Sequence, residues 1–402
     1  MQPLPHDPAS QDALPSIRRL VLADFRSYPA LDLTLQPGLV VLTGENGAGK
    51  TNLIEALSFL CPGRGLRRAE LAECARASSS GAWSVFVELA TEAGARQLGI
   101  GTERQTEGTL LRKYRLDREP ITSIKPFADL VRIIWLTPGM DGLFSGPAGE
   151  RRRFLDRLVL AVDAEQGTRV NALERALRNR NRLLEENADR RWLDATEHEV
   201  AELAVAVAAA RTETVSHLAA RIDEMKAEDS PFPYAELVLR GDVEALIGTR
   251  PALEVEDLYR GMLRQNRGRD AAAGRTLIGP QAADLLVRHG PKQADAARSS
   301  TGEQKALLTS LMLAHARLVA EVSGIKPIML LDEIAAHFDP VRRSALFEKL
   351  IALDAQVFMT GADATAFAEL RGCAQMLHVE MGRVMPHEEL AKAARGHVGP
   401  ET

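Results

Sequence analysis

The stretch Gly44-Glu45-Asn46-Gly47-Ala48-Gly49-Lys50-Thr51 decides the fold. Its pattern is that of a P-loop, in which glycines let successive backbone N–H groups turn toward phosphate oxygens. A short apolar run at 39–42 ends just before it, and apolar residues then recur with helical spacing up to residue 60. Strand, loop and helix in this order are the context that the motif requires. We therefore expect an α/β domain that binds ATP, with a plain glycine-rich turn as the alternative.

Each P-loop position has an expected role. Lys50 is expected between the β- and γ-phosphates, as a catalytic residue, and the Thr51 hydroxyl is expected on Mg²⁺. The helix that starts at the loop adds its positive N-terminus. The residues predicted to bind ATP here are Gly44, Glu45, Asn46, Gly47, Ala48, Gly49, Lys50, Thr51 and Asn52.

A second acidic motif lies far along the chain. The segment Ile328-Met329-Leu330-Leu331-Asp332-Glu333 is an apolar strand that ends in two acids, as in a Walker B motif. We expect Asp332 to hold Mg²⁺ together with Thr51, and Glu333 to orient or deprotonate the attacking water. Taken alone, the two acids could be a solvated turn. Because 282 positions separate Asp332 from Lys50, a large insertion must lie between the two halves of one site.

The insertion has two kinds of pattern. Short β runs at 85–89, 97–101, 110–116 and 131–136 predict an antiparallel sheet beside the nucleotide lobe. Helical spacing then dominates from 151 to about 226, broken at 185–191, which predicts a hairpin with arms of about 30 residues, roughly 45 Å long. Strand patterns return at 235–239, 276–278 and 285–288. The expected organisation is a disordered leader (1–16), an N-terminal ATPase half (17–150), a helical arm (151–270) and a C-terminal ATPase half (271–402).

Composition sets limits on function. The chain has 402 residues, 45% of them hydrophobic and 4% aromatic, and its net charge is −5. Few aromatics argue against base stacking as a main mode of binding. Three scattered cysteines indicate neither a zinc site nor a disulfide framework. No apolar run approaches the length that spans a bilayer, and the N-terminus lacks a signal-peptide pattern, so we expect a cytoplasmic protein without a membrane partner.

Two arginine-rich runs are candidates for phosphate binding. The first lies between 169 and 182 and has five arginines against one acid; the second, between 260 and 275, has the same ratio. Such runs could bind a nucleic-acid backbone without reading sequence, although a solvated helix face is an equally good interpretation. The candidate DNA-binding residues are Arg64, Arg67, Arg68, Arg175, Arg178 and Arg182.

The segment Ser300-Thr301-Gly302-Glu303-Gln304 precedes a helical run and resembles the signature motif of ABC-type ATPases. The Ser300 hydroxyl and the Gly302 N–H would suit a γ-phosphate. A helix cap of the capping-box type is the alternative.

At this point the chain resembles a known family. Asp24-Phe25-Arg26-Ser27-Tyr28, the P-loop, Pro62-Gly63-Arg64-Gly65-Leu66-Arg67, Arg151-Arg152-Arg153-Phe154-Leu155-Asp156, the signature segment, and Asp332-Glu333 with Asp339-Pro340 occur in the order found in the RecF family, which is related to SMC proteins. The resemblance runs from about residue 17 to 385.

The resemblance implies an ABC/SMC-type ATPase head with an antiparallel lobe and a short helical arm. Two subunits would dimerise head to tail around two ATP molecules, with Ser300, Gly302 and Asp339 acting across the dimer and Arg26 reaching back to the nucleotide. The family binds DNA, double-stranded or gapped, as an ATP-bound dimer. It helps RecO and RecR place RecA on gapped DNA, with slow, DNA-stimulated ATP hydrolysis.

Three departures accompany the resemblance. No glutamine lies between Gln105 and Gln166, so a transporter-type Q-loop has no counterpart, and no switch histidine follows the strand at 356–359. Gln281 and Ala282 stand where the family has His and Arg. Two other functions stay open: a nucleotide-binding subunit of a transporter, which the missing glutamine and histidine disfavour, and a scaffold that binds ATP without useful hydrolysis.

Overall fold

The computed structural model describes residues 15–387 except 78, 80, 106–108 and 227–229. The chain forms two compact units, one made of Met1–Met140 with Val319–Thr402 and the other of Asp141–Leu318. The second unit is larger than the predicted arm of 151–270, because strands and most of a long helix beyond residue 270 belong to it. The signature segment therefore lies in the second unit.

The first unit contains the mixed sheet that carries the P-loop. Its strand order is β15-β14-β3-β13-β12-β8, with β15 antiparallel and the others parallel. Four of the parallel strands, β3, β13, β12 and β8, are buried throughout, as expected for a parallel sheet. The strands are β3 (Leu39–Thr43), β8 (Ile133–Leu136), β12 (Ile328–Leu331), β13 (Val357–Gly361), β14 (Ala374–Glu380) and β15 (Arg383–Pro386).

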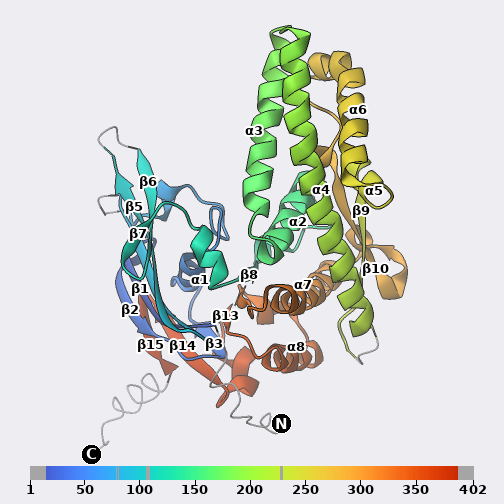
Figure 1. Ribbon diagram of the computed structural model, residues 1–402. Helices are drawn as coiled ribbons and strands as arrows, with labels where there is room; N and C mark the ends of the chain where they lie inside the picture. Colours follow the sequence, from blue (N-terminus) through green and yellow to red (C-terminus); the bar gives the residue numbers. More distant parts are fainter. Residues whose placement is uncertain (1–14, 78, 80, 106–108, 227–229, 388–402) are drawn as a thin grey trace, which may run out of the picture. The chain divides into compact units, whose positions relative to one another are not determined.

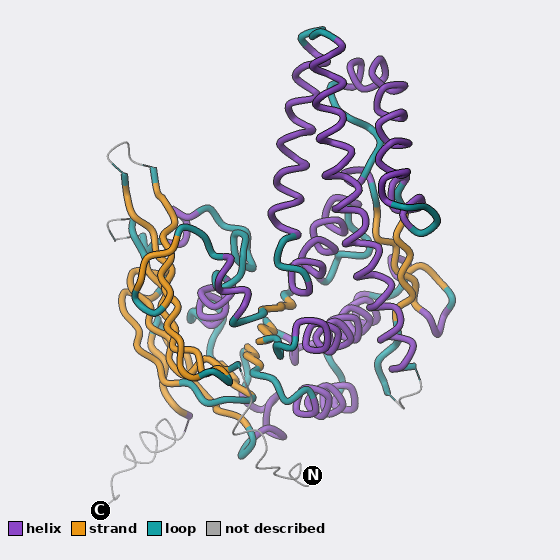
Figure 2. Tube along the Cα trace, viewed as in Figure 1, coloured by secondary structure: helices purple, strands orange, loops and turns teal. Residues whose placement is uncertain are grey.

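The second sheet of this unit is antiparallel, as predicted, and its strand order is β2-β1-β4-β5-β6-β7. Its strands are drawn in orange in Figure 2. Its strands are β1 (Ser16–Phe25), β2 (Tyr28–Thr34), β4 (Ser84–Thr91), β5 (Gly94–Arg104), β6 (Leu110–Leu116) and β7 (Glu119–Ile121). One prediction was wrong: the run at 131–136 does not join this sheet, because β8 pairs in parallel with β12. Its unbroken burial, rather than alternation, is typical of a parallel strand.

The N-terminal boundary also needs correction. Residues 1–14 of the predicted leader lie outside the described residues, but Ser16 is buried and already belongs to β1. The strand starts there because the Gln356 side chain accepts from the Ile17 N–H at 2.7 Å and donates to the Ile17 carbonyl at 2.9 Å. Two helices complete this unit, α1 (Lys50–Ser58) and α8 (Pro340–Ala352).

The second unit contains the predicted hairpin. Helices α3 (Gln166–Glu185) and α4 (Arg190–Met225) run side by side (Figure 1) and are joined at the polar stretch that the sequence indicated. The arms have 20 and 36 residues instead of about 30 each. A third helix, α6 (Ala252–Ala273), packs on both arms, and Leu177, Val200 and Tyr259 share one apolar core. The arm is therefore a three-helix bundle.

The rest of this unit surrounds the bundle's base. It consists of α2 (Ala148–Val162), α5 (Asp242–Ile247), the antiparallel strands β9 (Ala235–Arg240), β10 (Asp284–His289) and β11 (Ala294–Asp295), and most of α7 (Thr301–Ser323). The strand predicted at 276–278 is absent from the structure. There the Leu277 N–H donates to the Asp270 carboxylate at 3.0 Å, so side chains satisfy this backbone instead of a neighbouring strand.

Short 3₁₀ turns connect these elements, at Leu71–Cys74, Lys125–Asp129, Pro138–Met140, Pro280–Ala282, Gly290–Lys292, Ala296–Arg298, Ile334–His337 and Ala364–Leu370. Helix α7 corrects one expectation, since within the described part of the chain it is long and apolar enough to cross a membrane by length and composition. However, 72% of its apolar window is buried inside the protein, as in the core helix of a soluble protein.

Candidate functional site

The P-loop follows β3 and has the backbone that its glycines permit. Gly44, Gly47 and Gly49 have φ values of 145°, 86° and 117°. A Cβ at Gly44 would lie 2.1 Å from the Val379 carbonyl oxygen, and one at Gly49 would lie 2.8 Å from the Ser27 hydroxyl. Glycine is therefore required at both positions on conformational and steric grounds.

The loop lip is open to solvent. Glu45, Asn46 and Gly47 are exposed, and the Ala48 carbonyl accepts a hydrogen bond from the Gly382 N–H at 3.2 Å. The Tyr28 hydroxyl donates to the Gly49 carbonyl at 3.1 Å from beneath the loop. The loop is thus supported from two other segments while its outer residues are exposed, where a phosphate could approach.

Lys50 is almost fully buried, with 4% of its surface exposed. Its Nζ donates to the carbonyls of Gly44 and Glu45 at 2.6 and 2.8 Å. Burial lowers the pKa of Lys50, and the charges of Glu333 and Asp332 oppose that shift. The ammonium thus lies among neutral acceptors at the loop's centre, where phosphate oxygens would be stronger partners.

The structure brings the two distant motifs together. The Thr51 hydroxyl donates to Asp332 Oδ1 at 2.9 Å, although 281 positions separate the two residues. This contact arises because α1 starts after the P-loop that follows β3, and Asp332 follows β12, so that Thr51 and Asp332 both lie at the carboxyl edge of the parallel strands.

Thr360 is a site residue that the sequence analysis missed. It is fully buried at the end of β13, donates its hydroxyl to Asp332 Oδ1 at 2.7 Å and accepts from the Glu333 N–H at 2.9 Å. Thr360 thus orients both acids. Its place at the end of an apolar strand, like that of Asp332, was a usable signal in the sequence.

Glu333 has a left-handed backbone, with φ of 51° and ψ of 32°. A non-glycine residue in this region carries strain of about 1–3 kcal/mol, and such strain gathers at functional sites. The hydrogen bond from its N–H to Thr360 holds this conformation. The side chain is partly exposed, which leaves it accessible to a water molecule.

Arg26 does not point freely toward the loop. Its guanidinium makes a two-pronged ion pair with Glu55 of α1, at 2.9 and 2.7 Å, and Glu55 is fully buried. Arg67 reaches the same carboxylate at 3.1 Å and also donates to Asn52 at 2.7 Å. Arg26, Asn52 and Arg67 are therefore organised around Glu55, and the contact of Arg26 with a nucleotide stays a prediction.

The residues predicted to act across a dimer have local roles in one chain. The Ser300 hydroxyl accepts from the Glu303 N–H at 3.4 Å, while Glu303 accepts from the Ser300 N–H at 3.1 Å, which is the capping-box arrangement. A Cβ at Gly302 would meet no atom within 4 Å. Asp339 caps α8 by accepting from the Arg342 N–H at 3.0 Å. These caps leave the action in trans untested.

The arginines of the first run, at 169–182, differ in exposure because they lie on different faces of helix α3. Arg175, Arg178 and Arg182 are exposed on α3, whereas Arg180 of the same run is fully buried. Arg178 lies 3.7 Å from Glu174, and Arg182 donates to Asn179 at 3.1 Å. The three exposed candidates thus share one solvent face. Arg64, Arg67 and Arg68 are exposed as well.

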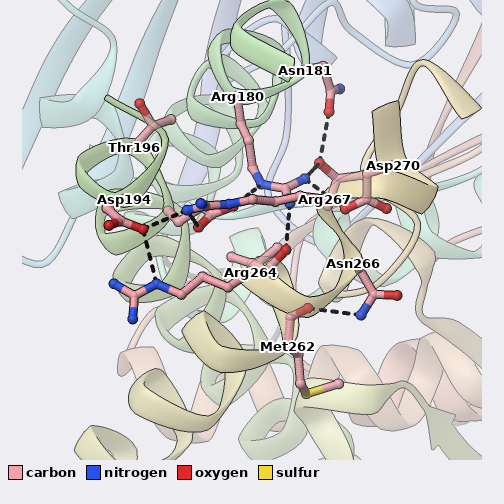
Figure 3. Close-up of polar contacts among 12 residues, drawn as sticks. Arg180, Asn181, Asp194, Thr196, Met262, Arg264, Asn266, Arg267 and Asp270 are labelled. Carbon is pink, nitrogen blue, oxygen red and sulfur yellow. Dashed lines mark hydrogen bonds and ion pairs between the residues drawn. The ribbon is translucent and has the colours of Figure 1, made fainter. Parts of the chain in front are cut away.

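The second run is not the basic patch that its local composition indicated. Arg264 and Arg267 of α6 point toward Asp194 of α4 (Figure 3), at 3.1 and 2.6 Å, and Arg267 also pairs with Glu197. Local counting missed these acids because they lie about 70 positions away in the sequence.

Known proteins share the sequence over most of this chain. Residues 16–384 match the family described as RecF/RecN/SMC N terminal domain. The chain is 50% identical to the DNA replication and repair protein RecF of Mesorhizobium japonicum over 374 residues, which cover 93% of this chain and 98% of the relative. It is 53% identical to RecF of Brucella abortus, covering 92% and 96%.

Solved structures share the fold. The recombination mediator RecF bound to ATPγS, from the RecFOR pathway, has a TM-score of 0.80 at 19% identity and covers 94% of this chain and 99% of its own. An SMC head bound to the winged-helix domain of ScpA has a TM-score of 0.54 at 16% identity, covering 94% and 100%. From the sequence identity and the family match, the chain belongs to the RecF family of SMC-like proteins.

Proposed function

We propose that this chain is an ATP-controlled DNA-binding ATPase of recombinational repair and replication restart. The observation that carries the proposal is the hydrogen bond between Thr51 and Asp332, which joins a P-loop to a Walker B strand end in a member of the RecF family. An assembled site of this kind favours nucleotide chemistry over a purely structural role.

ATP would bind on the P-loop with Lys50 exchanging its carbonyl partners for phosphate oxygens. A hard cation such as Mg²⁺ prefers oxygen ligands, and Thr51 and Asp332 offer a hydroxyl and a carboxylate that already touch. The donors therefore fit Mg²⁺, which when bound would neutralise phosphate charge. Within the described residues no group of three acidic, histidine or cysteine side chains could hold a metal ion.

Hydrolysis would depend on Glu333. Its carboxylate would orient the attacking water and accept a proton from it, while Lys50 would stabilise charge on the phosphate oxygens. The strained backbone of Glu333 and its link to Thr360 would fix the direction of the carboxylate. We expect slow turnover that DNA stimulates, so that hydrolysis acts as a timer.

Dimerisation would couple ATP to DNA. Ser300, Gly302 and Asp339 of one subunit would contact ATP on Lys50 of the other, so that ATP favours the closed dimer through contacts that the open state lacks. The exposed arginines, Arg64, Arg67, Arg68, Arg175, Arg178 and Arg182, would then bind backbone phosphates of duplex or gapped DNA without reading sequence.

The names of the relatives support the expected partners. A solved relative is a recombination mediator of the RecFOR pathway. We therefore propose RecR and RecO as protein partners and RecA as the protein whose loading is helped, in the cytoplasm.

The experiment that tests this function is Glu333→Gln. This variant should bind ATP without hydrolysing it and should accumulate as a dimer with saturating ATP and Mg²⁺, measured by multi-angle light scattering. Glu348→Gln, an exposed acid on α8, is the matched control and should behave like the unmodified protein.

Two outcomes would count against the proposal. If Glu333→Gln stays monomeric with saturating ATP and Mg²⁺, the proposal that ATP drives dimerisation is wrong. If ATP turnover is unchanged by both Lys50→Ala and Glu333→Gln, the scaffold alternative is favoured.

A further inference from the structure

A polar cavity of about 340 Å³ lies within the second unit, between α2, α3 and the segment that follows α6. Two arginines, Arg152 and Arg275, line it together with Asn181, Thr276 and Gln281. We call it the arginine pocket. None of its residues has a role in the function proposed above.

Arg152 brings a charge that no acid neutralises within the described part of the chain. Its Nη1 donates to the Ala283 carbonyl at 2.7 Å. The two carboxylates whose charges act on it are engaged elsewhere: Asp284 holds Arg151 through two bonds of 2.8 Å, and Asp156 holds Arg211 through two of 2.9 Å.

The surroundings of Arg152 disfavour its charged form, as its pKa indicates. Burial lowers the pKa of its guanidinium, and the positive charge of Arg211 lowers it further. A partly buried cation without a counter-ion is unfavourable, and an anion beside it would offset that penalty.

Arg275 stands on the same cavity with its side chain exposed, directly after the left-handed Gly274 that ends α6. Among the described residues, no side chain or carbonyl is bonded to its guanidinium. Two guanidinium groups that line one small cavity suit the charge of a phosphate group, which accepts paired N–H donors.

The neutral groups of the pocket have spare hydrogen-bonding capacity. Asn181 accepts from the Thr276 hydroxyl at 2.8 Å, which leaves the amide N–H₂ of Asn181 available to a ligand oxygen. Gln281 Oε1 is buried and has no hydrogen-bond partner in the described structure. That acceptor would suit a hydroxyl of a hydrogen phosphate or a bridging water.

The wall of the pocket is held rigidly from behind. Arg180 donates to the Thr276 hydroxyl at 2.7 Å and to the Asp270 carboxylate at 2.8 Å. The Thr276 hydroxyl in turn donates to Asn181, and Figure 3 labels Arg180, Asn181 and Asp270 in this group. Side chains fixed in this way lose little freedom when a ligand binds, which favours a formed site over an accidental gap.

We propose that the arginine pocket binds a phosphate group, with Arg152 and Arg275 as its charged ligands. The group comes either from a nucleic-acid backbone or from free phosphate. This site is separate from the P-loop and needs neither ATP nor dimerisation.

The first arm of the test uses inorganic phosphate, titrated calorimetrically at constant ionic strength. The full chain carries Lys50→Ala, which removes binding at the P-loop. In this background Arg275→Gln should weaken phosphate binding at least tenfold. The control is Arg153→Gln, which removes the same charge from the exposed face of α2, where Arg153 pairs with Glu150, and it should leave the affinity unchanged.

Arg152→Gln should weaken phosphate binding more than Arg275→Gln does. If this variant fails to fold, the exposed Arg275 still decides the question. Adding Ala282→Arg to Arg275→Gln should restore binding, because residue 282 lines the same cavity. Equal phosphate affinities for Arg275→Gln and Arg153→Gln would overturn the proposal. It would also be overturned if the Lys50→Ala parent binds no phosphate and Arg275→Gln leaves DNA binding unchanged.

The second arm uses a short DNA duplex without nucleotide, followed by fluorescence anisotropy against salt. If the phosphate comes from a backbone, Arg275→Gln should reduce the slope of log affinity against log salt by about 1, and Arg153→Gln should not. A change in the phosphate arm alone assigns the pocket to free phosphate. If the unmodified chain binds no DNA with or without ATP, the proposed function fails, while the phosphate arm still tests the pocket.

Discussion

Two buried clusters of charge, one in each unit, are built in opposite ways. Around Arg180 every contact is closed: its guanidinium donates to Glu197, Asp270, Thr276 and the Leu263 carbonyl at 2.7–3.1 Å, and it has no exposed surface. Around Lys50 the bonds are to neutral groups, since in the described part of the chain its ammonium donates to two carbonyls of its own loop. A closed cluster stabilises the fold, whereas an open one keeps its strongest interactions for a ligand.

This comparison predicts opposite consequences for removing the two cations. Taking away one partner of a buried ion pair leaves an uncompensated charge, which is strongly destabilising. Taking away a cation whose anionic partner is a ligand should instead reduce ligand affinity and leave the free protein nearly as stable.

The largest effect is expected for Arg180→Met. It leaves Asp270 without its cation and Glu197 with only Arg267, and we expect the free energy of unfolding to fall by about 3–5 kcal/mol. Urea unfolding followed by circular dichroism measures it. Arg178→Met, on the same helix but exposed, should change stability by less than about 0.5 kcal/mol. If Arg180→Met lowers the free energy of unfolding by less than about 1 kcal/mol, the cluster around Arg180 does not stabilise the fold in the way that its geometry indicates.

The two clusters also differ in how well the sequence predicted them. Gly44, Lys50 and Thr51 form a local motif, and Asp332 is recognisable by its strand, so the phosphate half of the site could be predicted. Thr360 could not be identified as easily, because its role depends on strand β13 lying beside β12. The capping role of Ser300 was weighed in advance, and the structure contains it.

Arg180 shows where local reasoning fails. It was counted within a basic run, yet its partners lie 17, 90 and 96 positions away. The run at 260–275 was misjudged for the same reason, since Asp194 and Glu197 on α4 neutralise two of its five arginines, Arg264 and Arg267. Whether a run of arginines forms a basic surface depends on which acids the fold brings beside it, whereas a P-loop is formed by consecutive residues. For this reason the P-loop was predicted correctly and the arginine runs were not.

The second effect in size concerns Lys50→Met. Loss of a charged donor to the phosphates should weaken ATP binding by about 2–3 kcal/mol, or roughly 30- to 150-fold, measured with a fluorescent ATP analogue. The unfolding free energy of the nucleotide-free protein should change by less than about 1 kcal/mol, because the buried ammonium makes no ion pair with any described residue. Strong destabilisation combined with unchanged ATP affinity would reverse the assignment of the two clusters.

The smallest effect concerns a third buried side chain that can carry a positive charge, His315 of α7. It belongs neither to the cluster around Arg180 nor to the one around Lys50. It hydrogen-bonds to the Leu158 carbonyl at 2.9 Å, and its Nδ1 is buried without a partner in the described structure. Burial lowers the pKa of His315 to about 4, and the nearby charge of Arg157 acts in the same direction. This histidine therefore stays neutral in the folded protein under conditions in which the unfolded chain takes up a proton.

The sign of the pH dependence follows from that difference. The unfolded chain protonates this residue near pH 6.5, whereas the folded protein does so near pH 4, so stability is complete above pH 6.5 and is lost as the pH falls toward 4. Between pH 7 and pH 5 the loss from this group is about 2 kcal/mol. His315→Gln keeps a donor for Leu158 and should flatten this part of the curve, measured by urea unfolding at each pH and compared with pH 8, where the histidine contributes nothing to the slope. If the unfolding free energies of the two proteins fall equally between pH 7 and pH 5, the charged form of His315 must be stabilised in the folded protein, as the charge of Arg180 is. The comparison between Arg180 and Lys50 would then not extend to His315.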